Sequence, residues 1–321
     1  MSASEDQDYV RIAWLYYMEG ATQADIAKKL GMTRLRVNRM LAEARESGLV
    51  RVQINARLQS CVELERQLEA DFNLEAAIII PTPEDQSLIP VNLGRAGGEF
   101  LSRYLQENEI HKFGVGWGET ILHIIRHLPE TRRPDMHVNS LMGGLTQGLE
   151  INTFEIAREL ARRLEAKCSY LVAPIYAGSP QSRDIILEQE VFALADKERA
   201  NDLALLSIGE LSPRSLLVRH GLPKDVSMQE LEALGAVGDV MGQFFTREGA
   251  LIPHGINERV IALSFEELRK VRTTIFAAGG RHKTEAIAGV LSAGLGSVLV
   301  CDEDTARAAA AMATRPPPRR S

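Results

Sequence analysis

The feature that most constrains this chain is the segment at 22–50, TQADIAKKLGMTRLRVNRMLAEARESGLV. In it, two short stretches with apolar residues at helical spacing are separated by a glycine. Gly31 can adopt the left-handed conformation that ends a helix, and Thr33 can cap the next helix. On both sides of Gly31, apolar residues recur at the spacing of one helix face: Ile26, Ala27 and Leu30, then Val37, Met40, Leu41 and Ala44. The stretch predicts two helices that share a core across a tight turn, a helix-turn-helix.

The second of these helices has an outward face rich in side chains that bind nucleic acid. With Val37 facing the core, a rotation of about 100° per residue turns a separate set of side chains outward. Arginine can bind guanine through two hydrogen bonds, asparagine can bind adenine, and leucine can contact a thymine methyl group. The candidate base contacts are Arg34 at the flank and Leu35, Arg36, Asn38 and Arg39, and the candidate phosphate contacts are Lys28, Lys29 and Thr33.

Charge is distributed unevenly along the chain. Residues 28–57 contain eight basic and two acidic residues, a net charge of +6, whereas the whole chain carries −6. The remainder therefore carries about −12, as expected for a module that binds double-stranded DNA and is attached to an acidic body. The alternative is a solvated pair of basic helices in a protein-binding domain, which the residues of the turn do not favour.

Three further elements are expected around the two helices. Residues 9–19, YVRIAWLYYME, predict an apolar supporting helix. Residues 50–55 alternate apolar and polar side chains and predict a short wing, in which Arg51 either reaches the DNA backbone or is an ordinary exposed residue. Residues 59–72 predict a linker helix that packs on the following domain or on a second subunit through an apolar stripe of Cys61, Leu64, Leu68 and Phe72.

From residue 76 onward, short apolar runs alternate with helical patterns, which is typical of a parallel α/β sheet covered on both faces. Strands are expected at 76–80, 113–117, 138–142, 170–173, 203–208, 274–278 and 298–301, and helices at 93–106, 120–128, 152–165, 186–200, 282–293 and 304–313. We therefore expect a winged helix-turn-helix domain at 1–57, a linker helix at 58–75, a larger parallel α/β domain at 76–313 and a disordered tail at 314–321.

The composition limits the class of protein. With 321 residues, 45% of them hydrophobic, the chain can bury a core in two domains. Its three cysteines lie far apart without a CxxC pair, and its histidines lack the spacing of metal ligands, so we expect no disulfide framework, no metal site and no cofactor. A polar N-terminus, and apolar runs well short of the ~20 residues of a membrane span, predict a cytoplasmic protein without a membrane partner.

Three glycine-rich loops follow predicted strands, where open α/β sheets bind their ligands. They are residues 114–120 (GVGWGET), 142–148 (MGGLTQG) and 278–283 (AGGRHK). Glycines let backbone N–H groups approach an anion, Thr120 adds a hydroxyl group, and Lys283 serves a phosphate as a cation or a sugar as a donor. Any one loop is more often explained by tight turning, but three in one sheet favour a binding site. Neither GxGxxG nor a P-loop is present, which disfavours dinucleotide and nucleoside triphosphate sites.

A fourth stretch, residues 235–249 (GAVGDVMGQFFTREG), places Asp239 among small and apolar residues, with His254 shortly after it. The carboxylate can accept hydrogen bonds from two sugar hydroxyl groups or act as a general base. An aspartate in a turn can instead bond its own backbone. The sequence leaves these interpretations open.

In combination and order, four segments resemble the SorC/DeoR-type family of bacterial sugar-binding transcriptional regulators. They are the helix-turn-helix at 22–50, VGVGWGET, GAVGDVMGQFF and AAGGRHKTEAIAGVLSAGLGSVLVCDEDTA. The resemblance implies that the second domain is similar to the sugar-phosphate isomerase fold with catalysis lost. It also implies that this domain binds a phosphorylated sugar or polyol, and that the protein is a homo-oligomer, a dimer or a tetramer.

The resemblance further implies an effector pocket. Carried over residue by residue, the pocket consists of Gly116, Gly118, Thr120, Gly143, Gly144, Gln147, Asp239, Gly280 and Lys283. Two positions depart from the pattern of the family: Glu119 replaces a small polar or basic residue, and Thr246 stands where relatives often have aspartate. An acidic Glu119 disfavours a phosphate unless its side chain points outward or the effector is an unphosphorylated polyol.

Two functions follow from these observations. The first is a DNA-binding transcriptional regulator of a carbohydrate or polyol catabolic operon, whose operator binding is modulated by a sugar, polyol or sugar-phosphate effector. The alternative is an active sugar-phosphate isomerase-like enzyme with a DNA-binding extension, in which Asp239, Glu119 and His254 are the candidate acid and base groups. No stretch places an acid and a base at a spacing that suggests catalysis. The enzyme interpretation also leaves the basic N-terminal module unexplained, so the sequence favours the regulator.

Overall fold

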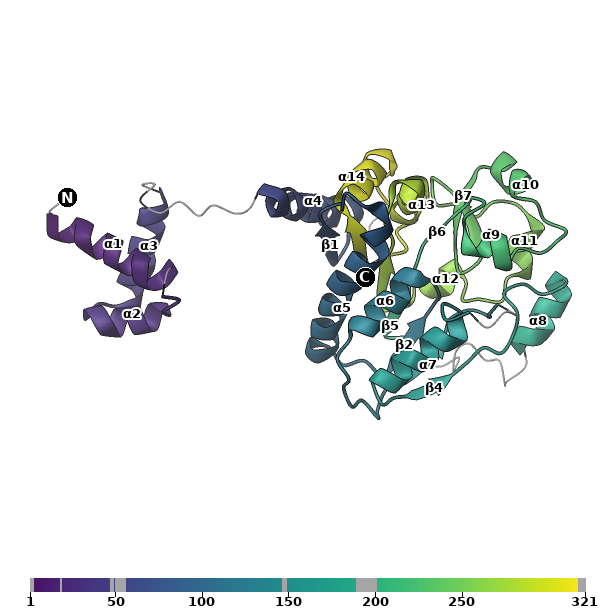
Figure 1. Ribbon diagram of the computed structural model, residues 1–321, viewed down its shortest axis with the longest axis horizontal. Coiled ribbons are helices and arrows are strands. Elements are labelled where there is room, and N and C mark those ends of the chain that lie inside the picture. Colours follow the sequence, from purple (N-terminus) through teal and green to yellow (C-terminus); the bar gives the residue numbers. More distant parts are fainter. Residues whose placement is uncertain are drawn as a thin grey trace. The chain divides into compact units, whose positions relative to one another are not determined.

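The computed structural model describes residues 3–17, 19–46, 49, 56–145, 149–188 and 201–316 (Figure 1). The backbone forms two compact units, Met1–Ala56 and Arg57–Ser321. The wing predicted at 50–55 lies outside the described residues. No helix in the described ranges is both long enough and apolar enough to cross a membrane.

The first unit is an assembly of three helices, α1 (Ala3–Tyr17), α2 (Gln23–Leu30) and α3 (Arg34–Glu46). Its core contains the side chains that the apolar spacing predicts, together with two from α1: Ile12, Leu15, Ile26, Ala27, Val37, Met40 and Leu41. The supporting role predicted for the first helix is therefore confirmed.

The turn between α2 and α3 is built by Gly31 and Thr33, as the sequence indicates. Gly31 ends α2 with a φ of +63°, and Thr22, for which no role was predicted, caps the start of that helix by accepting the N–H of Asp25 at 3.2 Å. Thr33 caps α3, because its Oγ1 accepts the N–H of Arg36 at 3.2 Å. These caps confirm the predicted pair of helices across a tight turn.

The second unit is built on a seven-stranded sheet in which every pairing is parallel. The strands lie in the order β1-β10-β9-β5-β2-β3-β4. Their bounds are β1 Ala76–Ile80, β2 Lys112–Val115, β3 His137–Ser140, β4 Lys167–Ser169, β5 Leu203–Leu206, β9 Thr273–Ala277 and β10 Val298–Asp302. The predicted parallel α/β domain is confirmed.

The strand predicted at 170–173 is wrong in position, because β4 ends at Ser169. β4 lies at the edge of the sheet, and both Lys167 and Ser169 are exposed, so the strand has no buried apolar run. Leu171, which belongs to the apolar run, is buried after the strand has ended, and its N–H donates to Ser140 Oγ at 2.7 Å.

Helices connect the parallel strands: α5 Ile89–Glu107, α6 Glu119–His127, α7 Thr153–Arg163, α8 Pro180–Glu188 and α13 Thr284–Ala293. Right-handed crossovers place α5, α6 and α7 on one face of the sheet and α13 on the other. α14 (Glu303–Met312) follows the last strand and packs against α13. α8 begins before the helix predicted at 186–200, of which residues 189–200 lie outside the described ranges.

The direction of the chain through the sheet reverses between β2 and β5. From β2 the chain passes through α6 to β3, whereas from β5 it leads to β9 on the opposite side. The segments that follow these two adjacent strands therefore diverge beyond the carboxyl ends. Open α/β sheets bind ligands in the crevice at such a reversal, and we call the region beyond the carboxyl ends of β2, β5 and β9 the crevice.

The linker helix α4 (Ala56–Phe72) covers the edge strand β1. Its apolar stripe, which includes Leu64 and Leu68, is buried in the core of the second unit. Glu65 accepts the N–H of Ile79 at 2.8 Å, and Glu69 accepts that of Ala77 at 3.0 Å. These bonds satisfy donors that an edge strand otherwise exposes. Of the two partners that the sequence left open for the stripe, the following domain is the one observed.

Between β5 and β9 the chain forms a small region that the sequence did not predict. It contains an antiparallel sheet of β6 (Gly209–Glu210), β7 (Ala236–Val240) and β8 (Gln243–Thr246), and the short helices α9 (Leu216–His220), α10 (Met228–Ala233), α11 (Gly255–Arg259) and α12 (Phe265–Leu268). β7 and β8 are buried on both faces, so residues 235–249 lack the alternation of apolar and polar side chains that indicates a strand.

The first residues of the predicted tail contact the second unit. The N–H of Thr314 donates to Ser292 Oγ at 3.0 Å, and an Arg315 nitrogen lies 2.5 Å from a carboxylate oxygen of Asp71. Residues 317–321 lie outside the described ranges.

Candidate functional site

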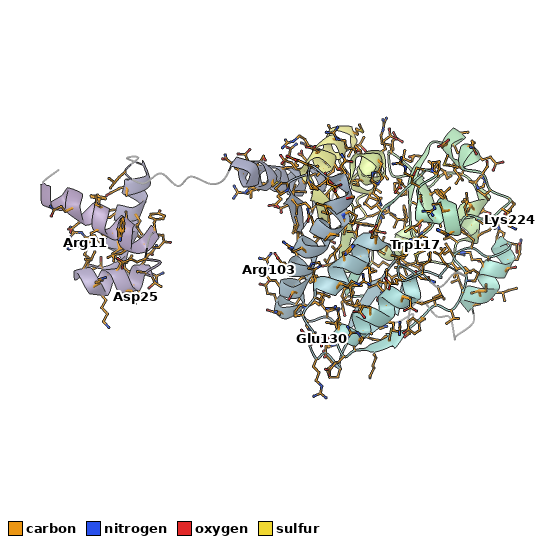
Figure 2. All side chains as sticks on the ribbon, in the orientation of Figure 1. Arg11, Asp25, Arg103, Trp117, Glu130 and Lys224 are labelled. Atoms are coloured by element: carbon orange, nitrogen blue, oxygen red, sulfur yellow. The ribbon has the colours of Figure 1, made fainter. Side chains whose placement is uncertain are left out.

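The outward face of α3 presents the predicted DNA contacts to solvent. Leu35 is 80% exposed, whereas Val37 is fully buried. Six more candidates are also exposed: Lys28, Thr33, Arg34, Arg36, Asn38 and Arg39. Figure 2 shows the side chains of this unit, with Asp25 of α2 labelled.

Two contacts orient this face. Asn38 Oδ1 accepts from Nε2 of Gln23 on α2 at 3.3 Å, and Arg39 Nε lies 3.7 Å from Glu43 Oε1 one turn later. Exposed pairs of this kind are worth little in water, so a base or a phosphate can replace either partner. Gln23 had no signal in the sequence, because its contact depends on how α2 crosses α3.

At the carboxyl edge of the sheet, the loops after β2 and β9 carry five predicted effector residues: Gly116, Gly118, Thr120, Gly280 and Lys283. The loop after β5 lies between them and contacts both. Ser207 Oγ donates to the carbonyl oxygen of Trp117 at 2.7 Å, and Lys283 Nζ donates to that of Ile208 at 2.7 Å. Trp117 is labelled in Figure 2. The loop after β5 was not predicted as part of the site. Its signal in the sequence is Gly209, which follows the apolar run at 203–208 in the same way as glycines follow the other two strands.

The loop after β2 offers backbone donors. Gly118 precedes α6 with a φ of +120°, and a Cβ added to it would lie 2.9 Å from Ser207 Oγ, so the position suits only glycine. No side chain caps α6 at Gly118, which leaves the N–H groups of its first turn for solvent or for a ligand oxygen. Thr120, in the same turn, is half-buried.

Glu119 does not obstruct this loop. Its side chain is 64% exposed, and its carboxylate lies 3.9 Å from Nε2 of His123, one turn along α6. The side chain therefore points outward, which is one of the two conditions under which an acidic residue is compatible with a phosphate here. A carboxylate in the first turn also favours the helix.

Asp239 lies at the turn between β7 and β8 and is buried. Its Oδ2 accepts the N–H of Gly242 at 2.9 Å, as in the interpretation of a turn aspartate that bonds its own backbone. Burial raises the pKa of Asp239 to about 6, although the Gly242 hydrogen bond and the charge of Lys283 oppose the shift and the charge of Glu210 adds to it. Asp239 is thus both a structural carboxylate and a part of the electrostatic surroundings of Lys283.

His254 has a structural role as well. Its Nδ1 accepts the N–H of Ile256 at 3.1 Å and caps α11. A nitrogen used in this way is not available as the base that an isomerase requires.

In the loop after β3, the two predicted glycines serve packing. The N–H of Gly143 donates to Ile261 at 2.8 Å, and the N–H of Gly144 donates to Ala173 at 2.9 Å. A Cβ on Gly143 would lie 2.2 Å from the carbonyl oxygen of Pro174. Neither N–H group is open to an effector. Close approach of the backbone explains Gly143, and close approach of the Phe154 and Asn152 side chains explains Gly144. Gln147 lies outside the described residues.

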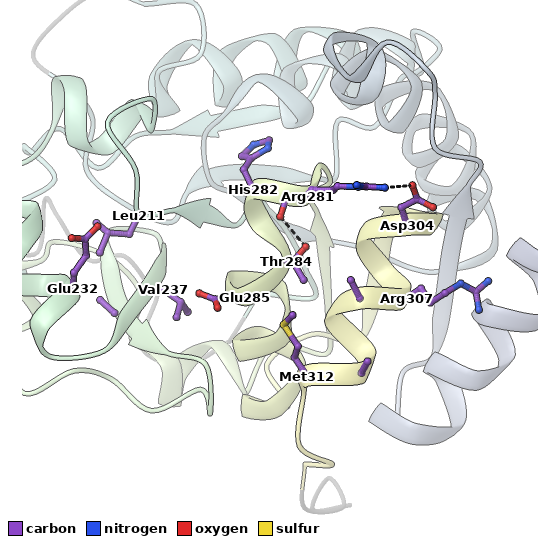
Figure 3. Close-up of a pocket in the computed structure, with 13 residues that line it drawn as sticks. Leu211, Glu232, Val237, Arg281, His282, Thr284, Glu285, Asp304, Arg307 and Met312 are labelled. Carbon is purple, nitrogen blue, oxygen red and sulfur yellow. Dashed lines mark hydrogen bonds and ion pairs between the residues drawn. The ribbon is translucent and has the colours of Figure 1, made fainter.

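A groove of about 890 Å³ lies beside the third loop, between α13, α14 and the small sheet (Figure 3). Arg281 and His282, in the short 3-10 turn η3 (Arg281–Lys283), line it. Arg281 is paired with Asp304 of α14 at 3.3 Å. Lys283 instead extends to Ile208 and Glu210 at the strand ends. Because the three strand-end loops contact one another in the crevice and Lys283 extends there, the crevice is the better candidate for the effector site.

Neither a metal centre nor a reactive thiol is indicated in the described ranges. No group of three or more His, Cys, Asp or Glu side chains is placed there to hold a metal ion. Burial, with the nearby Glu303 carboxylate, raises the pKa of Cys61 to about 11, which keeps the thiol protonated.

Replacing Gly143 tests its assignment to packing. We expect Gly143→Ala to lower the free energy of unfolding by about 1–3 kcal/mol without any ligand, because the new methyl group meets backbone oxygen atoms. Gly178→Ala is the matched control, since nothing lies within 4 Å of a Cβ there. Urea denaturation measures both, and equal stability of the two variants would show that Gly143 is not a packing glycine.

The buried carboxylate of Asp239 predicts a pH-dependent difference between the wild type and Asp239→Asn. The pKa is 3.8 without burial and about 6 in the folded protein, so folding takes up a proton between these values and wild-type stability falls as pH rises through them. Relative to the wild type, Asp239→Asn should gain about 3 kcal/mol between about pH 4 and pH 7. Urea denaturation across this range tests it, and a difference independent of pH would contradict the prediction.

Comparison with known proteins agrees with this arrangement. The family model described as "Putative sugar-binding domain" matches residues 56–309. The chain is 29% identical over 309 residues to the erythritol catabolism regulatory protein EryD of Brucella abortus (strain 2308), covering 96% of this chain and 98% of that protein. It is 30% identical over 322 residues to the transcriptional regulator LsrR of Enterobacter sp. (strain 638), covering 98% and 95%.

A solved structure shares the fold. The full-length sorbitol operon regulator SorC from Klebsiella pneumoniae has a TM-score of 0.71 at 26% identity, covering 95% of this chain and 99% of that one. The relatives are transcriptional regulators and not enzymes, so the isomerase alternative is not favoured. The chain belongs to the SorC-type family of sugar-binding transcriptional regulators.

Proposed function

We propose that this regulator binds double-stranded operator DNA through the outward face of α3 and binds its effector in the crevice beyond β2, β5 and β9. The observation that carries the proposal is the meeting of three strand-end loops where the direction of the chain through the sheet reverses. Gly118, Thr120 and Lys283 are the principal effector contacts. The N–H of Gly118 itself donates to the carbonyl oxygen of Ile151 at 3.4 Å, so the backbone donors are the N–H groups of the first turn of α6, which Gly118 leaves uncovered. With the hydroxyl group of Thr120 and the ammonium group of Lys283, they are donors that suit a ligand rich in oxygen.

The proposed effector is a polyol, a sugar or a sugar phosphate, and the operon is one of carbohydrate or polyol catabolism. The names of EryD and SorC refer to erythritol and sorbitol, which are both polyols. A phosphate on such a ligand has a favourable position at the uncapped start of α6.

The regulator acts in the cytoplasm as a homo-oligomer, a dimer or a tetramer. Helix-turn-helix proteins reach high affinity by occupying two half-sites at once. An effector that favours one arrangement of subunits then changes operator occupancy through a coupling of about 1–3 kcal/mol.

Alanine substitutions on α3 test the DNA-binding face. Arg36→Ala and Arg39→Ala should each weaken operator binding about 5- to 150-fold, because a bidentate contact to guanine contributes about 1–3 kcal/mol. Arg11→Ala is the control, since Arg11 is equally exposed but belongs to α1 (Figure 2). Fluorescence anisotropy at fixed salt, with an operator selected from random DNA, gives the affinities. If both α3 variants retain sequence-specific affinity, α3 is not the recognition helix.

Lys283→Ala tests the effector site. In a thermal-shift screen of sugars, polyols and their phosphates, the effector should stabilise the wild type by about 2.7 kcal/mol at a hundredfold excess over Kd. Lys283→Ala should lose this stabilisation and keep its operator affinity in the absence of ligand. Lys224→Ala, which removes an exposed lysine of the region between β5 and β9, should behave as the wild type (Figure 2). Undiminished stabilisation of Lys283→Ala would move the site elsewhere.

A further inference from the structure

The charge of Lys283 is already compensated inside the crevice. Its Nζ lies 3.4 Å from Oε2 of Glu210 and donates to the carbonyl oxygen of Ile208 at 2.7 Å. The two charged side chains are only 21% and 11% exposed. Salt screens a partly buried pair of this kind much less than a surface pair, so the pairing persists in solution.

The small antiparallel sheet fixes the position of Glu210. β6 pairs with β7 so that Gly209 lies opposite Asp239 and Glu210 lies opposite Gly238. A Cβ on Gly209 would lie 2.0 Å from Oδ1 of Asp239, so the backbone of β6 packs directly against that carboxylate. Ser212 Oγ also donates to Oε1 of Glu210 at 3.4 Å. Glu210 is therefore held by both its backbone and its side chain.

Glu210 carries its negative charge beside Lys283. Burial raises the pKa of Glu210, but the charge of Lys283 and a backbone hydrogen bond outweigh this effect, and the pKa lies below its usual value. The ammonium group of Lys283 is thus already matched by a carboxylate at 3.4 Å, and a phosphate placed at Lys283 would be repelled by Glu210.

We propose that Glu210 determines which chemical class of ligand this end of the crevice accepts. Glu210 and Lys283 together bind hydroxyl groups of a polyol or sugar, and Glu210 keeps phosphate and carboxylate groups away from Lys283. This inference rests on the proposed function, because it requires the effector to lie at Lys283. A phosphorylated effector accordingly binds with its hydroxyl-bearing end at Lys283 and its phosphate elsewhere.

Hydroxyl groups suit the pair because each of them both donates and accepts. One hydroxyl donates to a Glu210 oxygen while its neighbour on the carbon chain accepts from Lys283 Nζ, so that a vicinal diol bridges the two side chains. Hydrogen bonds to charged groups are stronger than those between neutral groups. A ligand that lacks one of these hydroxyl groups leaves a partly buried charge without that hydrogen bond. It therefore binds more weakly than the diol.

The test compares the full-length wild type with Glu210→Gln, which removes the charge and keeps the shape. Glu285→Gln is the matched control, because Glu285 is an exposed carboxylate two residues after Lys283 that lines the groove of Figure 3. The ligands are erythritol, ribitol, sorbitol, their monophosphates and inorganic phosphate. Thermal shift identifies the ligands that bind, and calorimetric titration gives their Kd values.

We expect at least one polyol or polyol monophosphate to bind the wild type, and Glu210→Gln to weaken that binding about tenfold or more. Inorganic phosphate should stabilise Glu210→Gln but not the wild type, because Lys283 is left with an unpaired charge. Glu285→Gln should match the wild type in both respects.

Two results would overturn the proposal. One is a Kd for Glu210→Gln within about threefold of the wild type. The other is stabilisation of the wild type by inorganic phosphate that disappears in Lys283→Ala. If no ligand stabilises the wild type, the proposed effector site fails and this inference fails with it. Binding that requires Lys283 but not Glu210 refutes this inference alone.

If Glu210→Gln does not fold, Glu210→Asp tests whether Glu210 selects hydroxyl groups over phosphate at Lys283. It keeps the negative charge and withdraws the carboxylate by one methylene group. The variant should still exclude inorganic phosphate and should bind the polyol ligand more weakly than the wild type. Stabilisation of Glu210→Asp by inorganic phosphate, or wild-type affinity for the polyol ligand, would contradict the proposal.

Discussion

The effector unit depends on the two hydrogen-bond ladders that hold β5 between β2 and β9. β5 pairs with β2 on one side and with β9 on the other, and its four residues are buried. Because all three strands run in the same direction, their carboxyl ends meet at one edge of the sheet. Gly118, Ser207 and Lys283 become neighbours through these ladders, although they lie far apart in the sequence.

The small sheet between β5 and β9 gives this edge its charge. A buried carboxylate is costly unless it is hydrogen-bonded, and Asp239 meets that requirement through the N–H of Gly242 in its own turn. The same carboxylate occupies the space where a side chain of Gly209 would lie, and so holds β6 close to β7. Glu210 follows directly in β6 and reaches Lys283. A carboxylate that closes a hairpin therefore also sets the electrostatic character of the crevice.

The sequence predicts the parts of this structure whose causes lie close together in the chain. Gly31 and Thr33 act within one turn of their own helices, so their roles are readable from the sequence. Buried parallel strands are readable from their apolar runs, whereas the exposed edge strand β4 is not. Gly143 shows the opposite limit, because its N–H bonds a carbonyl oxygen more than a hundred residues away at Ile261. No local pattern separates such a packing glycine from a ligand-binding one.

The candidate site shows the same division. Gly118 and Lys283 follow from the rule that ligands bind where a strand ends in a glycine-rich loop, and that rule also applies to the loop that contains Glu210. The contact between Glu210 and Lys283, however, depends on the pairing of β6 with β7, which is a long-range feature without a plain alternation in sequence. The residues proposed to hold an effector are thus more readable from the sequence than the residue proposed to select among effectors.

A continuous set of hydrogen bonds, made by the strand ladders and by side-chain carboxylates at both ends, connects the third glycine-rich loop to α4. The N–H of Gly280 donates to Asp302 Oδ1 at 2.7 Å, and Asp302 is the last residue of β10, which pairs with β1 along its whole length. β1 in turn donates to Glu65 and Glu69 of α4. An effector changes operator affinity only if it binds two arrangements of the protein unequally. The carboxylates of Glu65 and Glu69 tie α4 to β1 in addition to apolar packing, so α4 is not free to slide across that strand. A movement of residues 280–283 would therefore have a contiguous set of contacts to the helix where the second unit begins.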